Sequence, residues 1–278
     1  MRCSEPMLPS PIKWVGGKSK LRRKVIERLP DDAECYCEVF AGAAWVLFGK
    51  APHAVEVIND VNNDLVNLYR VIKWRTAELM EEIQHSMYSR VMFYELRANK
   101  PTNEMDRAVW MYLMIQMSFG ADLSNSQSAA FGYRNKSRGD LFLSKAEDNL
   151  PRIKERMRQV FVENLDFADV IRRYDQPRSI FFCDPPYLET LGYASDFGEC
   201  DHVRLRDALT GIEGRFLLTI NDHPAIRELY AAFRMEEAME SRAKSLSTQG
   251  RQAAPILFIS NYAPPIVANH PDLFTHGD

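Results

Sequence analysis

The sequence has no long apolar run and few cysteines. No stretch approaches the ~20 consecutive apolar residues that a membrane-spanning helix requires, and the first residues, MRCSEPMLPSPIKW, lack the apolar core of a signal peptide. The five cysteines are an odd number without a Cys-x-x-Cys pair, a pattern that fits neither a disulfide framework nor a zinc site. We therefore expect a cytoplasmic protein with reduced thiols, without a metal ion and without membrane contact.

The chain also lacks the glycine patterns of common nucleotide-binding loops. A Gly-Gly-Lys triplet at 16–18 precedes an expected amphipathic helix, but the G-x-x-x-x-G-K-[ST] spacing of a phosphate loop is absent. Residues 34–60 have the order strand, glycine turn, helix, strand and terminal acid, without the three-glycine dinucleotide fingerprint. Phe40 and Gly42 lie in this turn, and Asp60 is placed to accept ribose hydroxyls. The expected ligand is a nucleoside derivative without a pyrophosphate.

The most informative stretch is SIFFCDPPY at 179–187. Its first five residues predict a strand buried on both faces, as in parallel sheets covered by helices, and the two prolines end that strand because neither donates a backbone hydrogen bond. DPPY then lies at the carboxyl end of a strand, where open α/β sheets bind ligands. A carboxylate, a carbonyl held outward by proline and an aromatic face suit a planar ring with an exocyclic amine. The alternative is a plain turn after a strand.

An excess of charge of one sign is also missing, because the net charge is −3. That average hides basic segments. Residues 1–28 hold eight Lys or Arg and two acidic residues, residues 134–158 hold eight and four, and residues 241–251 hold three and none. Such segments are commonly solvated surface, but beside a base-binding loop they predict contact with nucleic-acid phosphates.

Strand and helix patterns alternate along most of the chain, which predicts an α/β fold. We expect a Rossmann-like sheet with helices on both faces, formed by residues 1–75 and 158–278. A mostly helical insertion at 76–157 interrupts it. Within the insertion, residues 120–139 are polar and punctuated by glycine, which predicts either a flexible surface loop or an element that probes a groove.

Seven short motifs occur in a fixed order along the chain. They are KWVGGK (13–18), EVFAGAA (38–44), IND (58–60), NLDF (164–167), DPPY (184–187), LLTIND (217–222) and ISNY (259–262). In these motifs the chain resembles the Dam-type, D12-class DNA adenine-N6 methyltransferases, which use S-adenosylmethionine. The motifs cover nearly the whole chain, and a target-recognition segment precedes DPPY as it does in that family.

The resemblance implies a role for each matching residue. The cofactor-binding residues would be Trp14, Lys18, Phe40, Gly42, Asp60, Asp166, Phe167 and Asp184. The catalytic residues, which would hold a flipped adenine while its amine attacks the methyl group directly, would be Asp184, Pro185, Pro186 and Tyr187. Candidates for contact with double-stranded DNA are Arg22, Arg23 and Lys24 on phosphates, and Asn125, Tyr133, Arg134, Lys136 and Arg138 in the insertion, which we call the 76–157 recognition insertion. We expect a monomer and no metal.

Two departures from the family pattern leave alternatives open. The glycines usual after the phenylalanine are replaced by Ala41-Gly42-Ala43-Ala44, and the extra methyl groups could crowd the methionine moiety. This feature motivates the alternative of a DNA-binding homologue without catalysis. The segment after Met117 lacks the Asn-Arg and Asn-Gly pairs of GATC-reading members, so the resemblance does not imply GATC as the recognition site. An N4-cytosine or RNA amino-methyltransferase and a restriction-endonuclease partner also stay open.

Overall fold

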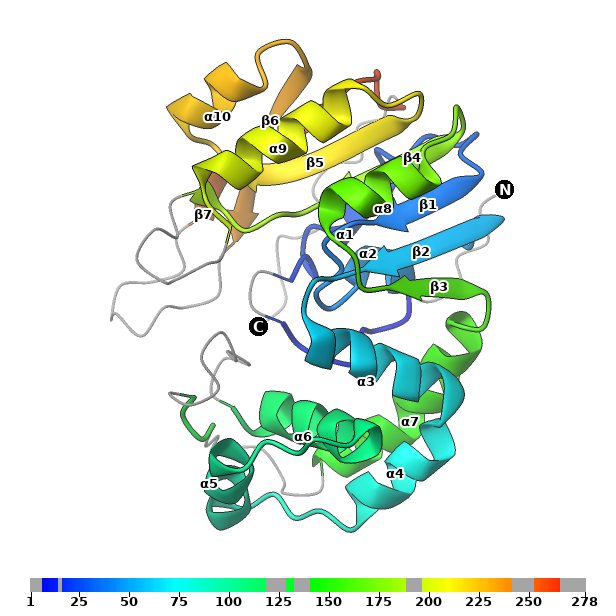
Figure 1. Cartoon of the computed structure of the whole chain (residues 1–278), viewed down its shortest axis with the longest axis vertical. Helices are drawn as coiled ribbons and strands as arrows, with labels where there is room; N and C mark the ends of the chain where they lie inside the picture. The colour runs from blue at the N-terminus through cyan, green and yellow to red at the C-terminus, as the bar shows by residue number, and fades with distance from the viewer. Residues whose placement is uncertain are drawn as a thin grey trace, which may run out of the picture.

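The computed structural model describes residues 7–14, 17–118, 129–132, 141–188, 197–241 and 253–265. Its centre is a seven-stranded sheet of order β3-β2-β1-β4-β5-β7-β6 (Figure 1). The strands are β1 (Cys35–Glu38), β2 (Val55–Asn59), β3 (Val160–Glu163), β4 (Ser179–Cys183), β5 (Arg215–Asn221), β6 (Arg234–Ser241) and β7 (Ala253–Ser260). The strands β1 to β5 are parallel, and β7 is antiparallel to both β5 and β6. The predicted Rossmann-like α/β fold is confirmed.

Helices cover both faces of this sheet. They are α1 (Arg22–Ile26), α2 (Trp45–Gly49), α3 (Asn63–Trp74), α4 (Thr76–Gln84), α5 (Arg90–Ala98), α6 (Glu104–Met117), α7 (Leu141–Arg156), α8 (Phe167–Tyr174), α9 (Glu199–Thr210) and α10 (Pro224–Leu229). Figure 1 shows α8 and α9 in front of the sheet and α1 and α2 behind it, with α4 to α7 gathered below α3.

The apolar run of β4 explains why the sheet is buried on both faces. Side chains of a strand alternate between its faces, so an apolar residue at every position supplies two cores. Ile180 and Phe182 pack in the core formed with α1, α2 and α3. Phe181 and Cys183 pack in the second core, formed with α8, α9 and α10. The strand therefore ends in a rigid setting just before DPPY.

The helices α4 to α7 are joined to the sheet through a buried ion cluster. Arg156, at the end of α7, pairs with both carboxylate oxygens of Glu56 on β2 and donates to the Leu47 carbonyl at 2.9 Å. Lys50 pairs with the same carboxylate from the other side. Removing one partner of such a cluster leaves a buried charge uncompensated, at a cost of about 3–5 kcal/mol. The end of α7 is therefore anchored to β2 and α2.

The sequence did not predict β6. Its residues, RMEEAMES, include no β-branched side chain and have the composition of a helix, which is why no strand was expected there. Eight consecutive residue pairs with β7 make it a strand at the sheet edge. Tertiary pairing therefore overrides local propensity in this segment. The consequence for the site is large, because β6 brings an acidic residue to it.

The described cysteines form no disulfide bond. Cys35, Cys37 and Cys183 are free and buried, and Cys200 is free and exposed. No helix in the described part of the chain is both long enough and apolar enough to cross a membrane.

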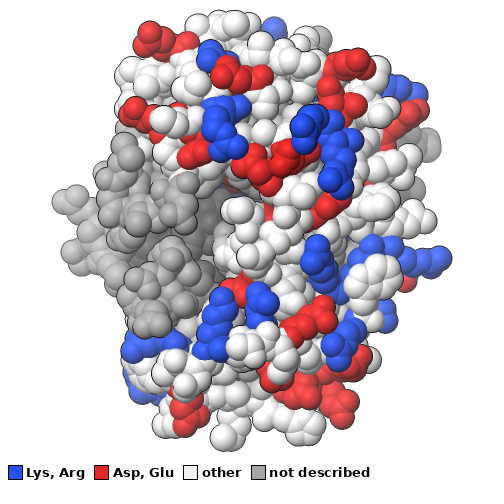
Figure 2. All heavy atoms as spheres, viewed as in Figure 1, with Lys and Arg blue, Asp and Glu red and all other residues white. Residues whose placement is uncertain are grey.

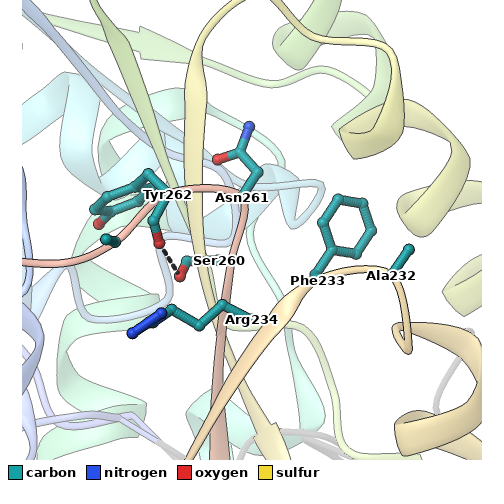
Figure 3. A pocket seen from close by; sticks show the side chains of 7 residues that line it. Ala232, Phe233, Arg234, Ser260, Asn261 and Tyr262 are labelled. Carbon is teal, nitrogen blue, oxygen red and sulfur yellow. Dashed lines mark hydrogen bonds between the residues drawn. The ribbon is translucent and has the colours of Figure 1, made fainter.

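The ISNY motif, Ile259 to Tyr262, closes the edge of the sheet opposite the parallel strands' carboxyl ends. Asn261 accepts from Phe216 N at 2.9 Å and donates to Gly214 O at 3.0 Å, and the Tyr262 hydroxyl donates to Arg28 O at 2.8 Å. A hollow of about 380 Å³ lies there, lined by residues 232–234 and 260–263. Figure 3 shows the side chains that line it. The motif thus has a structural role, away from the crevice where the other motifs meet.

Candidate active site

The site lies at the carboxyl ends of the parallel strands. From β1 the chain proceeds outward to β2 on one side, while β4 lies on the other side of β1. Loops that leave adjacent strands in opposite directions open a crevice, and open α/β sheets bind ligands at such a point. The glycine turn follows β1 and DPPY follows β4, so both predicted ligand loops border this crevice.

The glycine turn is held from three sides. Gly42 has φ of +47°, a left-handed conformation that favours glycine, and its N–H donates to Asp60 Oδ2 at 2.9 Å. Its carbonyl accepts from the Tyr69 hydroxyl at 2.7 Å. A Cβ added at Gly42 would lie 3.0 Å from Trp14 Cδ1. The structure therefore brings together Trp14, Gly42 and Asp60, three of the predicted cofactor residues.

Asn59 links the loops that follow three neighbouring strands. Its amide donates to the carbonyls of Val39 at 3.0 Å and Leu165 at 3.1 Å, and its Oδ1 accepts from Leu165 N at 2.9 Å. Because Val39 precedes Phe40 and Leu165 precedes Asp166, this single buried amide sets the positions of two more predicted residues. Asn59 belongs to the IND motif, but no pattern in the sequence predicts this linking role.

An aromatic cluster lies beside the glycine turn. The ring centroids of Phe40 and Phe167 are 5.8 Å apart, and each is 5.6 Å from that of Phe197. Asp166 caps α8 by accepting from Ala168 N. Arg204 donates to both oxygens of Asp166 at 3.0 Å, and its guanidinium lies 4.7 Å from the Phe167 centroid. The sequence did not single out Phe197 or Arg204, because neither lies in a recognisable motif.

The DPPY carboxylate is fixed by two neighbours. Asp184 Oδ1 accepts from Lys18 Nζ at 2.8 Å and from the Thr219 hydroxyl at 2.8 Å. Burial raises the pKa of Asp184, while Lys18 and Thr219 act to lower it. Thr219 and Asn221 are the polar residues among the buried positions of β5, and a polar residue inside an otherwise apolar strand is a signal that the sequence contains.

The Tyr187 ring completes this group. Lys18 Nζ lies 4.8 Å from its centroid, and the Tyr187 hydroxyl donates to Glu240 Oε2 at 3.4 Å. Lys18 is only 5% exposed. Burial alone would lower the pKa of Lys18, but Asp184, Tyr187 and Glu240 together raise it above its ordinary value. Lys18 is therefore a charged ammonium among two carboxylates and an aromatic ring.

The predicted DNA contacts are only partly within the described residues. Arg22 donates to the Leu8 carbonyl at 3.1 Å and lies over the Trp45 ring, whereas Arg23 and Lys24 are exposed on α1. The other predicted contacts lie outside the described residues: Asn125, Tyr133, Arg134, Lys136 and Arg138. Figure 2 shows Lys and Arg side chains beside the grey area on the lower half of this face, and both signs of charge over the rest of the lower half and over the upper half.

A buried acid supports the glycine turn from below. Glu38 Oε2 accepts from Leu47 N at 2.9 Å and from the Tyr36 hydroxyl at 3.0 Å. Burial raises the pKa of Glu38 from 4.5 to about 7. The folded state therefore binds a proton that the unfolded state releases between these pH values. This contribution to the free energy of unfolding is present below pH 4.5 and is lost as the pH rises through 7.

We expect Glu38→Gln to remove this pH dependence. Between pH 5 and pH 8.5 the wild type should lose about 2.5 kcal/mol more free energy of unfolding than the variant, since one pKa unit corresponds to about 1.4 kcal/mol. Urea unfolding of both proteins at the two pH values measures the difference, and all other titrating groups cancel in it. If the wild type and Glu38→Gln lost the same free energy of unfolding between the two pH values, Glu38 would be ionised in the folded state.

A Rossmann-like sheet with an acid-proline-proline-tyrosine loop at its crevice is the arrangement of an amino-methyltransferase. The sequence profile described as D12 class N6 adenine-specific DNA methyltransferase matches residues 14–244. The chain therefore belongs to the D12 class N6 adenine-specific DNA methyltransferases, as the motif resemblance predicted.

Named relatives span most of this chain. The type II methyltransferase M.CviBI of Paramecium bursaria Chlorella virus NC1A is 25% identical over 80% of this chain and 86% of its own length. The type II methyltransferase M1.LlaDCHI of Lactococcus lactis subsp. cremoris is 24% identical over 90% of this chain and 94% of its own length. The DNA adenine methylase of Escherichia coli K12 is 25% identical, with coverage of 92% and 96%.

Proposed function

We propose that this chain transfers a methyl group from S-adenosylmethionine to N6 of an adenine that has left the DNA stack. The observation that carries the proposal is the group formed by Asp184, Lys18, Thr219 and Tyr187 at the crevice between β1 and β4. A charged acceptor, a fixed cation and an aromatic face meet where the two ligand loops border each other. D12-class enzymes use S-adenosylmethionine generally, which supports the choice of methyl donor.

The residues around the glycine turn fit that donor. Asp60 offers a buried carboxylate to ribose hydroxyls, and Trp14 packs against the turn where a side chain at Gly42 would clash. Phe40 and Phe167 form an apolar wall beside the Asp166 carboxylate, a combination suited to an adenine ring and its amine. When bound, S-adenosylmethionine supplies a methyl group on a positively charged sulfur.

The alanines that follow Gly42 are also compatible with a bound methyl donor. Ala43 is 2% exposed and Ala44 is fully buried, and both belong to the core behind the sheet. Their methyl groups therefore pack among apolar side chains rather than into the crevice. This placement favours an active enzyme over the alternative of a DNA-binding homologue that has lost catalysis.

The DPPY residues then orient the target amine. Both fixed contacts of Asp184 are made by Oδ1, so Oδ2 is the oxygen that accepts a hydrogen of the amine. Tyr187 offers its ring to the base, which offsets the stacking lost on leaving the duplex. An ionised carboxylate next to N6 favours the positive charge that develops there during attack. Orientation and charge are thus supplied by residues that the fold already holds in place.

The experiment that tests this proposal identifies the product. The purified protein is incubated with genomic DNA and labelled S-adenosylmethionine, and the DNA is digested to nucleosides. We expect the label in N6-methyladenine. Label in N4-methylcytosine, or transfer only to RNA, would overturn the proposal. Calorimetry with S-adenosylmethionine separates a lack of cofactor binding from a lack of DNA recognition.

We further propose that the 76–157 recognition insertion reads the DNA sequence. The exposed basic side chains that Figure 2 shows on the helical half of the molecule support this assignment. Sequencing of methylated DNA from cells that express the protein would give the recognition site, which the resemblance leaves open. A monomer and a restriction-endonuclease partner stay predictions from the resemblance.

Arg23 and Lys24 should bind phosphates rather than bases. Both are exposed on α1, which follows Lys18 out of the crevice. We expect the double variant Arg23→Ala, Lys24→Ala to weaken binding equally for all DNA sequences and to reduce the salt slope by about 0.9 for each lost contact. Binding measured from 50 to 200 mM salt tests this. The control replaces Arg172 and Arg173, exposed at the far end of α8, and should keep the wild-type slope.

A further inference from the structure

The strand that the sequence did not predict carries an acid into the active site. Because β6 is antiparallel to β7, and β7 is antiparallel to β5, β6 points in the same direction as the parallel strands. Its second-last residue, Glu240, therefore lies at the crevice edge. The Glu240 side chain is 15% exposed, and its Oε1 lies 3.8 Å from Lys18 Nζ. Its Oε2 accepts the 3.4 Å hydrogen bond from the Tyr187 hydroxyl.

We propose that Glu240 is a positioning residue that holds the Tyr187 ring and shares the Lys18 ammonium with Asp184. This inference rests on the proposed function and assigns a role in it to a residue outside every motif. Glu240 acts through its two neighbours and does not touch the reacting atoms.

The charges in the pocket explain why a second carboxylate is useful. With Asp184 as its sole partner, the buried Lys18 ammonium on Oδ1 would draw the negative charge of that carboxylate away from the target amine on Oδ2. Glu240 gives that ammonium a second anion within 4 Å, so that Asp184 Oδ2 keeps more of its negative charge for the amine while Oδ1 holds Lys18. The pocket then carries one net negative charge, which suits a positive charge developing on the amine.

The contact with the Tyr187 hydroxyl explains the second part of the role. A tyrosine ring that stacks on a base must keep its plane, and rotation about its side-chain torsions would lose that plane. Tyr187 follows two prolines on one side, and Leu188 N donates to Asn221 Oδ1 at 3.2 Å on the other. Those contacts fix the backbone, and the Glu240 contact fixes the far end of the ring.

A double-mutant cycle tests this role. The proteins are the wild type, Glu240→Ala, Tyr187→Phe and the double variant, compared by single-turnover rate at saturating S-adenosylmethionine. Glu240→Ala should slow transfer about tenfold or more, the usual scale for a hydrogen bond to a charged group. Because both single changes break the same contact, the double variant should be within about threefold of the slower single variant. The proposal would be overturned if the rate losses of the two single variants multiplied in the double variant, or if the Glu240→Ala rate were within twofold of wild type.

The pH dependence gives a reading that a purely structural role would not change. The charged and titratable groups facing Asp184 are Lys18 before α1, Tyr187 on its own loop, Glu240 on β6 and Glu38 on β1. Glu240 acts to raise the pKa of Asp184, so Glu240→Gln should lower that pKa and move the acid limb of the rate profile to lower pH. If the acid limb of Glu240→Gln lay at the same pH as that of the wild type, the proposal that Glu240 and Asp184 share the Lys18 ammonium would be contradicted.

Controls separate this inference from the proposed function. Glu236 lies on the same strand and pairs with Arg28 at the surface, so Glu236→Gln should keep the wild-type rate and pH profile. Calorimetry with S-adenosylmethionine measures the donor affinity of Glu240→Ala separately, because Glu240 contacts Lys18, which is one of the predicted donor-binding residues. The single-turnover rate at saturating S-adenosylmethionine then reports on methyl transfer alone. A wild type without methyl transfer would refute the proposed function, whereas an active wild type with unaffected Glu240 variants would refute this inference alone.

Discussion

Asp184→Ala should lower the rate of methyl transfer by roughly a thousandfold or more, the scale observed when one preorganised electrostatic group is removed from an active site. The variant loses the acceptor for the target amine, and it also leaves the Lys18 ammonium without its nearest carboxylate at 2.8 Å. The measurement is a single-turnover rate at saturating DNA and S-adenosylmethionine. A rate near that of the wild type would remove DPPY from the mechanism.

Two further variants make this result specific. Asp207→Ala removes an exposed carboxylate on α9 and should keep the wild-type rate. Asp184→Asn retains an oxygen that can accept from the Thr219 hydroxyl but removes the charge. We expect its rate to lie between those of Asp184→Ala and the wild type. Thermal unfolding of all three proteins shows whether a lost rate reflects a lost fold, because a buried unpaired Lys18 also costs stability.

The site could be predicted from sequence where its residues belong to strand ends. The continuous apolar run of β4 indicated a strand buried on both faces, and the following DPPY had to lie at its carboxyl end. The same reasoning placed Gly42 after β1 and Asp60 after β2. In each case a local pattern determines the position, because parallel strands bring their carboxyl ends to one edge whatever the intervening chain does.

Residues positioned by pairing between distant segments could not be predicted in this way. Glu240 lies on a strand with the composition of a helix, and only its pairing with β7 directs it to the crevice. Arg204 reaches Asp166 because α8 and α9 pack side by side, which no spacing in the sequence specifies. Phe197 joins the aromatic cluster from a loop without a motif. Such contacts depend on the packed core rather than on local periodicity.

Lys18→Met should produce the second large effect, a loss of roughly a hundredfold or more in the rate at pH 7. The ammonium is the cation nearest to Asp184, and its removal leaves that carboxyl with Glu240 as a like-charged neighbour. Loss of the ammonium raises the pKa of Asp184, a shift to which the Glu240 carboxylate already contributes in the wild type, and a protonated carboxyl cannot accept the amine hydrogen in the same way. The loss should therefore depend on pH.

The rate profile of Lys18→Met should have its acid limb at higher pH than that of the wild type. Because Asp184 must be ionised to act, the variant should be impaired more at pH 6 than at pH 9. Lys20→Met, in the exposed turn two residues away, should reproduce the wild-type profile at saturating DNA. Adding Glu240→Gln to Lys18→Met should move the acid limb back toward the wild type, because it removes the like charge that remains beside Asp184. Parallel profiles of Lys18→Met and the wild type would mean that Lys18 does not control the ionisation of Asp184.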